Sequence, residues 1–213
     1  MAEVKKRKRR TATAERTRQH FIKVARDLFA SLGFRDTTMN GIAKSAGKSR
    51  RTLYTYFSTK EDIYLEVIKE EFDFLYSELE KFVNQPLPTP EKLMRYIGRR
   101  EEMINNVVMW NGTLEAEFFN DIATLERARV RFDVLERRLI RQMLQEGIAG
   151  GYFRSSLDPT RTTMLLHACL KGLEVPYIRG QLGRSRESLV RTYFIVYDLI
   201  LKGIGNNTEE EEE

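Results

Sequence analysis

A short segment of the chain, SRRTLYTYFSTK at residues 49–60, gathers side chains that are suited to binding a polyanion. An arginine side chain can donate two parallel hydrogen bonds to O6 and N7 of guanine. Phenol hydroxyl and ammonium groups suit phosphate oxygens, and such contacts position a protein on DNA without reading its sequence. We therefore expect nucleic-acid recognition here, with four candidates for contacts to base edges: Arg50, Arg51, Thr52 and Thr55.

These candidates need a helix that turns them away from the protein core. Leu53 and Phe57 are four residues apart, so they share one face of a helix. We expect that face to pack on three apolar residues from the preceding segments: Phe29, Ile42 and Ala46. The four candidates then lie on the other faces of this helix, toward solvent or a groove.

The elements around this segment have the order of a helix-turn-helix. Apolar residues at spacings of three and four predict a first helix that ends at Gly33: Phe21, Val24, Ala25, Leu28, Phe29 and Leu32. A second helix starts after Thr37 or Thr38 and ends at Gly47, and a third runs from its cap Ser49 to about Phe57. Two short helices joined by a glycine-containing turn place the second of them in the DNA major groove.

Charge is divided unevenly along the chain. Residues 1–60 hold 16 Lys and Arg against 4 Asp and Glu, a net charge of +12, and the remainder holds 20 against 27, a net charge of −7. A basic head on an acidic body agrees with DNA binding by the head alone. The run Lys5–Arg10 is either an inert tail or an arm that reaches DNA, and both alternatives stay open.

Helical periodicity continues to the end of the sequence, and the expected fold class is all-α with about nine helices. A reciprocal cap at Thr59 and Asp62 opens a fourth helix to about Val83. Prolines then interrupt at 85–90, and further helices are expected at 89–108, 113–120, 122–149, 160–180 and 186–204. Asp158-Pro159 and Ser185 are start signals for the last two, and Pro176 is expected to kink or shorten the former.

Residues 21–65 resemble the DNA-binding domain of the TetR family of one-component transcriptional regulators. The matching positions cover about a quarter of the chain: Ala25, Leu28, Phe29, Gly33, Phe34, Thr37, Thr38, Ile42, Ala43, Ala46, Gly47, Ser49, Thr52–Phe57, Lys60, Glu61 and Ile63. The stretch GIAGGYF at 147–153 and the two last helices resemble the ligand and dimer domain of that family more loosely.

The resemblance assigns further DNA contacts. Tyr54, Tyr56 and Lys60 match positions that touch the DNA backbone in family members, although one tyrosine is expected to be partly buried. Thr38 can bind a phosphate through its hydroxyl at a helix start. Asn40 can contact either a base or a phosphate, and Ser49 completes the predicted DNA-binding set. The family typically carries a smaller residue, often glycine, at the position of Arg51, which leaves open whether this arginine reads a base or binds a phosphate.

No catalytic, metal or cofactor site is predicted. His20 and His167 are far apart and have no Cys or carboxylate at metal-ligand spacing, so His167 is expected to be a core or pocket histidine. Walker and Rossmann glycine motifs are absent from the sequence. Cys169 is the only cysteine and fits a reducing compartment. With no apolar run of the roughly 18 residues that span a bilayer, we expect a cytoplasmic protein and no membrane partner.

The second domain is expected to bind a small apolar or aromatic effector, or simply to have a packed core. The candidate lining residues are Met103, Val107, Trp110, Phe118, Phe119, Phe132, Leu166, His167, Leu170 and Tyr177. Apolar positions on the last two helices exceed one narrow stripe, which favours a homodimer through a four-helix bundle. The expected interface residues are Leu165, Cys169, Leu173, Leu189, Tyr193, Val196, Tyr197 and Ile200.

Together these expectations describe a dimeric, TetR-like regulator, most simply a repressor released from a palindromic operator by a lipophilic effector. The expected domains are a basic disordered arm at 1–12, a DNA-binding domain at 13–60, an effector and dimerisation domain at 61–205, and a disordered acidic tail at 206–213. One alternative is a dimeric regulator whose second domain binds a protein or no ligand. An enzyme with a vestigial DNA-binding head is the other, and no motif supports it.

Overall fold

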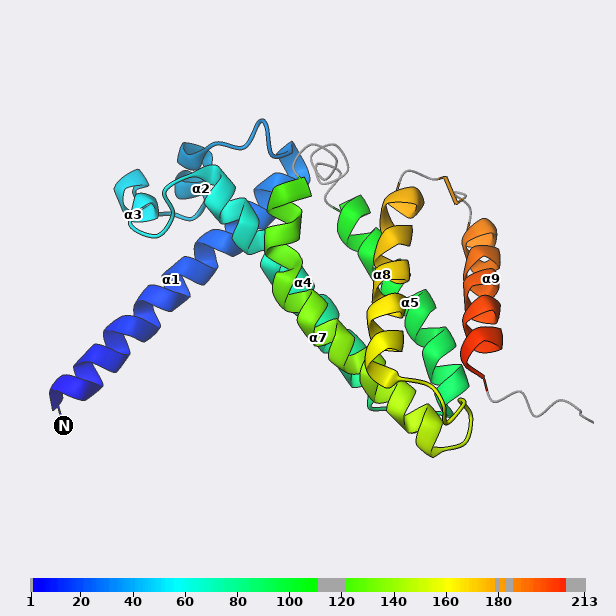
Figure 1. Ribbon diagram of the computed structural model, residues 1–213. Helices are drawn as coiled ribbons and strands as arrows, with labels where there is room; N and C mark the ends of the chain where they lie inside the picture. The colour runs from blue at the N-terminus through cyan, green and yellow to red at the C-terminus, as the bar shows by residue number, and fades with distance from the viewer. Residues whose placement is uncertain (1, 111–121, 179–180, 183–185, 206–213) are drawn as a thin grey trace, which may run out of the picture. The chain divides into compact units, whose positions relative to one another are not determined.

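The computed structural model describes residues 2–110, 122–178, 181–182 and 186–205, and their secondary structure is helical, without a strand (Figure 1). The all-α prediction is therefore confirmed. The described helices are α1 (Ala2–Leu32), α2 (Met39–Ser45), α3 (Arg50–Tyr54), α4 (Lys60–Val83), α5 (Thr89–Trp110), α7 (Ile122–Ala149), α8 (Pro159–Ile178) and α9 (Arg186–Ile204). The helix expected at 113–120, the cap Ser185 and the tail 206–213 lie outside the described residues.

The chain forms two compact units. The first contains residues 1–72 and 108–129, and the second contains residues 73–107 and 130–213. The first unit thus extends beyond the boundary expected at residue 60. Ion pairs from Arg18 to Glu66 and from Arg26 to Glu70 join the first half of α4 to α1. We therefore call α1, α2, α3 and the first half of α4 together the head.

The head is held together by apolar side chains from α1 to α4. Phe21, Ala25 and Phe29 of α1 are buried, whereas Leu32 is 55% exposed, contrary to its expected place on the apolar face. Leu32 is the last residue of its helix, and the chain turns away at Gly33, whose φ of 88° requires glycine. The remaining core residues of the head are Ile22, Ile42, Ala43, Ala46, Leu53, Phe57, Ile63, Tyr64, Val67 and Ile68.

Side-chain caps fix where the short helices begin. The Thr38 hydroxyl accepts a hydrogen bond from the Gly41 N–H at 3.0 Å, so Thr38 rather than Thr37 caps α2. Thr37 instead donates to the Gly33 carbonyl at 2.7 Å. At α4, Asp62 accepts from the Thr59 N–H at 2.9 Å and donates its own N–H to the Thr59 hydroxyl at 3.1 Å, which confirms the reciprocal cap.

The basic start of the chain differs from the expected disordered arm at residues 1–12, because α1 is continuous from Ala2 to Leu32. The segment contains no glycine or proline and is rich in Ala, Glu, Lys and Arg, which are strong helix formers. Extending an existing helix fixes one residue per added hydrogen bond and avoids the cost of nucleation. The helix of the head therefore continues into the basic segment.

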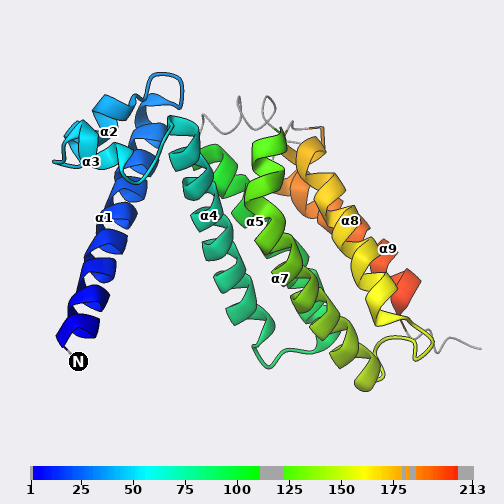
Figure 2. The same cartoon turned by 60° about the vertical axis from the view of Figure 1, so that its left-hand side comes forward.

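In the second unit, α5, α7, α8 and α9 lie alongside one another, as Figure 2 shows. α7 ends at Ala149, followed by Gly151 at a φ of 73°, as the glycine pair predicted. Asp158 accepts from the Thr160 N–H at 2.8 Å and so caps α8, whose first residue is Pro159. Pro176 lies inside α8, two residues before its end. Among the described residues, no helix is long and apolar enough to cross a membrane.

Candidate functional site

Helix α3 is held in one orientation by its cap and its buried side. The Ser49 hydroxyl accepts a hydrogen bond from the Thr52 N–H at 3.1 Å, and Leu53 is fully buried. Arg50 and Arg51 are exposed on the remaining surface. The sequence prediction that this helix presents its arginines outward while Leu53 and Phe57 face the core agrees with the structure.

Arg50 and Tyr54 lie together on that surface. The Arg50 guanidinium is 5.4 Å from the centre of the Tyr54 ring and donates to the Tyr54 hydroxyl at 3.3 Å. Tyr54 is 43% exposed. Because the two residues are one helical turn apart, a base-reading candidate and a phosphate-binding candidate share one edge of α3.

Thr52 of α3 and Thr55, which caps the C-terminal end of α3, are placed differently. Thr52 is half-buried and its hydroxyl lies 2.8 Å from the Ser49 hydroxyl. Thr55 is exposed and donates its hydroxyl proton to the Thr52 carbonyl at 2.7 Å. Each hydroxyl oxygen keeps a lone pair for a further contact, but Thr52 and Ser49 have structural roles in the helix start.

The side chains of Tyr56 and Lys60 contact other residues of the head. The Tyr56 side chain is half-buried, and the centre of its ring lies 5.8 Å from the centre of the Phe21 ring. Tyr56 is thus the partly buried member of the tyrosine pair. The Lys60 ammonium donates to the carbonyls of Phe34 and Arg35 and lies 4.2 Å from the centre of the Phe34 ring. Lys60 therefore ties the start of α4 to the loop after α1, a contact that the sequence did not reveal.

The predicted contacts at the start of α2 lie on the surface. Thr38 and Asn40 are both exposed, and the Thr38 side chain already serves as the cap. The structure thus brings the predicted DNA-binding residues to the α2–α3 surface, with Lys60 at the adjacent start of α4.

The candidate pocket residues are only partly within the described side chains. Phe132, Leu166, His167 and Leu170 are buried, and Met103 is half-buried. The side chains of Val107, Trp110, Phe118, Phe119 and Tyr177 lie outside the described residues.

A buried ionic network, missed by the sequence analysis, occupies the interior of the second unit. Arg100 of α5 is fully buried and forms ion pairs with Glu136 of α7, Glu174 of α8 and its neighbour Glu101. The Tyr96 hydroxyl also donates to Glu136 at 3.0 Å. The sequence does contain a signal that these two charged residues are buried, because each lies on the apolar face of its helix. Arg100 falls on the face formed by Leu93, Tyr96, Ile97 and Ile104. Glu136 falls on the face formed by Phe132, Ile140 and Met143.

Burial and ion pairing act in opposite directions on these carboxyls. Burial raises the pKa of Glu101 to about 7, against the attraction of Arg100. Burial also disfavours ionised Glu136, but Arg100 and His167 outweigh it and hold the pKa of that carboxyl at about 2. Glu136 is therefore the ionised partner of Arg100, while Glu101 exchanges its proton near neutral pH.

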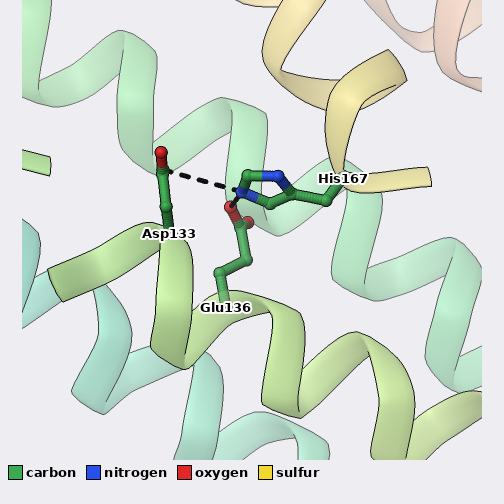
Figure 3. Close-up of side chains that lie close together, drawn as sticks. All are labelled: Asp133, Glu136 and His167. Carbon is green, nitrogen blue, oxygen red and sulfur yellow. Dashed lines mark ion pairs between the residues drawn. The ribbon is translucent and has the colours of Figure 1, made fainter. Parts of the chain in front are cut away.

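His167 has carboxylate companions that its sequence spacing concealed. Its Nε2 lies 3.3 Å from Oε2 of Glu136 and 3.6 Å from Oδ1 of Asp133, and both carboxylates come from α7 (Figure 3). The three groups could hold a metal ion, since their ligand atoms all lie within 4.8 Å of one another. The sequence spacing gave no sign of these carboxylates, because residues more than 30 positions apart in sequence become neighbours when α7 and α8 pack.

An apolar surface covers parts of α8 and α9. Met164 and Leu165 of α8 and Phe194, Ile195 and Leu199 of α9 are each more than half exposed. Of the predicted interface residues, Cys169 is also exposed, and Leu173, Val196, Tyr197 and Ile200 are half-buried. The side chains of Leu189 and Tyr193 lie outside the described residues.

A capped helix-turn-helix with exposed arginines, followed by a separate helical unit, defines a DNA-binding transcriptional regulator. The family model of bacterial regulatory proteins of the tetR family matches residues 21–67. The chain is 30% identical over 145 residues to the transcriptional repressor KstR2 of Mycolicibacterium smegmatis, an alignment that covers 66% of this chain and 69% of that protein. The chain belongs to the TetR family, as its sequence resemblance implied.

Solved structures share the fold over most of the chain. A transcriptional regulator from Cytophaga hutchinsonii has a TM-score of 0.71 at 23% identity, with 87% of this chain and 97% of that chain covered. FadR from Bacillus subtilis in complex with stearoyl-CoA has a TM-score of 0.61 at 21% identity, with 87% and 98% covered. These similarities extend the family fold to the second unit.

Proposed function

We propose that this regulator is a homodimeric repressor that binds a palindromic operator through α3 and is released by a small lipophilic effector. The observation that supports operator binding is the fixed, outward presentation of Arg50 and Arg51 on a helix capped by Ser49. A twofold dimer places two such helices in successive major grooves, and this arrangement requires two inverted half-sites. Such a protein acts where chromosomal DNA lies, which makes the cytoplasm its proposed location.

Each predicted DNA contact has a proposed role. Arg50, Arg51, Thr52 and Thr55 read base edges, whereas Thr38, Asn40, Ser49, Tyr54, Tyr56 and Lys60 position the head on the backbone. The contact of Arg50 with Tyr54 supports this division, because a phosphate held by the tyrosine would orient the arginine toward a base. For Lys60, binding a phosphate requires the ammonium to share its protons with, or leave, the carbonyls of Phe34 and Arg35.

The effector site is proposed in the second unit, whose described range includes the buried side chains of Phe132, Leu166 and Leu170. Relatives support a lipophilic ligand: one Bacillus subtilis relative is a fatty acid metabolism regulator, and the FadR structure contains stearoyl-CoA. The effector must bind the DNA-free state more tightly than the DNA-bound state, since equal affinity would shift no population.

Selection from a random pool of double-stranded DNA tests operator binding. We expect enrichment of an inverted repeat by the full-length protein and weaker enrichment by Arg50→Ala. Recovery of sequences without twofold symmetry would contradict the proposed dimeric reading.

The selected duplex then serves to test the effector, with stearoyl-CoA as the probe and free coenzyme A as its control. Release of the duplex by stearoyl-CoA alone supports the proposed effector class. Operator binding that neither compound changes would reject a long-chain acyl-CoA effector and favour a second unit that binds a different ligand, a protein or nothing.

A further inference from the structure

Three side chains that can bind a metal ion lie close together in the second unit, and none of them is proposed to contact DNA. Asp133 and Glu136 are three residues apart on α7 and therefore lie on one face of that helix. His167 faces them from α8, and Figure 3 shows its Nε2 directed toward both carboxylates. The site thus joins two helices through one imidazole nitrogen and two carboxylate oxygens.

Two distances within this group match those between donor atoms that share an ion. Zinc–nitrogen and zinc–oxygen bonds of about 2.0–2.2 Å place two donors of a tetrahedral site roughly 3.3–3.5 Å apart. Here Nε2 lies 3.3 Å from Glu136 Oε2 and 3.6 Å from Asp133 Oδ1. All three ligand atoms lie within 4.8 Å of one another, so rotation of the carboxylates can close the group around a small divalent cation.

The two carboxylates are the contacts of the imidazole nitrogen in the described part of the chain. His167 is 5% exposed, and its buried Nε2 makes no well-aligned hydrogen bond to either carboxylate, although one oxygen of each lies within 3.6 Å. A cation held between the three groups would accept the Nε2 lone pair and balance the charge of both carboxylates.

Both carboxylates are held with one oxygen turned toward the histidine. Glu136 accepts hydrogen bonds at Oε1 from Arg100 and from the Tyr96 hydroxyl, while its Oε2 faces His167 and receives only a longer bond of 3.3 Å from Arg100. Asp133 contacts Lys171 through Oδ2 at 3.3 Å, and its Oδ1 lies 3.6 Å from Nε2 of His167. Such outer contacts orient metal ligands in known sites.

We propose that Asp133, Glu136 and His167 bind a divalent transition-metal ion of the zinc type. Imidazole nitrogen suits Zn²⁺ and its first-row neighbours, and two carboxylates supply the negative charge that such an ion requires. Three protein ligands leave at least one position for water. The ion joins α7 to α8 and so stabilises the second unit. Operator binding by α3 does not require such an ion.

Metal binding is measured on the full-length protein with Co²⁺ and Zn²⁺ as probes, after treatment with a chelator. We expect one Co²⁺ per chain with visible absorption, displacement of Co²⁺ by Zn²⁺, and a rise in melting temperature on addition of Zn²⁺. His167→Gln and Asp133→Asn should lose stoichiometric binding and the rise in melting temperature. Tyr96→Phe, which keeps all three ligands, should weaken Co²⁺ binding by about tenfold or more.

His20→Ala is the matched control, since it removes the other histidine of the chain and should leave binding unchanged. Absence of stoichiometric binding in the wild-type protein overturns the proposal, as does binding that survives in folded His167→Gln. Should that variant fail to fold, X-ray absorption of the Zn²⁺-loaded wild-type protein decides. One imidazole with oxygen ligands supports the proposed site, whereas a sulfur ligand from Cys169 contradicts it.

Discussion

At the scale of single residues, charged groups occupy two opposite environments. Arg50 stands exposed on α3, where its guanidinium is free to exchange its contact with Tyr54 for one with DNA. Arg100 is fully buried and held by three carboxylates. The first arrangement suits recognition, because replacing an exposed contact by another costs little free energy. Removing one partner of a buried pair instead leaves an uncompensated charge.

Arg50→Ala tests base reading by α3. We expect a loss of operator affinity of about 1–3 kcal/mol, because one bidentate contact to a base is removed, with a much smaller loss on random DNA. Fluorescence anisotropy with both duplexes measures the difference. Arg161→Ala, an exposed arginine of α8, is the control and should change neither affinity. An equal loss on both duplexes would assign Arg50 to the phosphate backbone.

Glu101→Gln tests the buried carboxyl through pH. The folded-state pKa of Glu101, about 7, lies above the ordinary value of 4.5, so the folded protein holds a proton that the unfolded chain releases. Stability from this group is therefore complete below about pH 4.5 and is lost as the pH rises through about 7. Thermal melting in the presence of a chelator should show a flatter pH dependence in this window for the variant. Glu102→Gln, at the exposed neighbouring position, should retain the wild-type slope.

At the scale of elements, close approach of two segments depends on a glycine in α7. A Cβ atom built on Gly147 would lie 2.1 Å from Cδ2 of the Phe153 ring, and Phe153 is only 1% exposed. The chain turns at Gly151 and returns so that the Phe153 N–H donates to the Gly147 carbonyl at 3.1 Å. The GIAGGYF stretch is thus a packed turn that closes the end of α7.

Gly147→Ala is expected to destabilise the protein by about 1–3 kcal/mol, because the added methyl group forces the Phe153 ring from its buried place. Urea unfolding followed by circular dichroism measures the change. Gly98→Ala is a matched control within α5, where an added Cβ meets no atom within 4 Å. That control should be neutral or stabilising by about 1 kcal/mol, owing to the higher helix propensity of alanine. Similar losses in both variants would contradict the role given to the ring contact.

At the scale of the whole molecule, the exposed apolar surface of α8 and α9 is the feature that one chain leaves uncovered. Leu165 is 68% exposed and Leu199 is 67% exposed, on neighbouring helices of the second unit. Large apolar side chains that are exposed on adjacent elements are typical of interaction sites. Pairing of two copies through these helices would cover the surface and supply the twofold axis that an inverted-repeat operator requires.

Leu199→Glu is expected to weaken self-association by at least about tenfold, since the interface would bury an unpaired charge. Analytical ultracentrifugation over a range of protein concentrations measures the dimer fraction. Val130→Glu places the same charge on α7 at a position that is 61% exposed and should leave association unchanged. If Leu199→Glu remains a dimer, the proposed α8–α9 interface is excluded.

The caps, the turn and the buried side of α3 in the head were predictable from sequence, because their determinants are close along the chain, whereas the contact of Lys60 with the loop after α1 was not. The caps at Ser49 and Asp62, the turn at Gly33 and the buried side of α3 each follow from residues within a few positions of one another. The basic segment at residues 1–12 was expected to be disordered, whereas α1 includes it from Ala2 onward, since its residues are strong helix formers.

The interior of the second unit was decided by tertiary structure. Arg100 meets Glu136 and Glu174 across 36 and 74 residues, and His167 meets Asp133 from another helix. Helical periodicity in the sequence shows that Arg100 lies on a buried face, but it does not show which distant helix covers that face. The sequence by itself thus determined the family of regulators to which the protein belongs and predicted the helix that reads DNA, whereas packing of α5, α7 and α8 decided which charges meet inside the second unit.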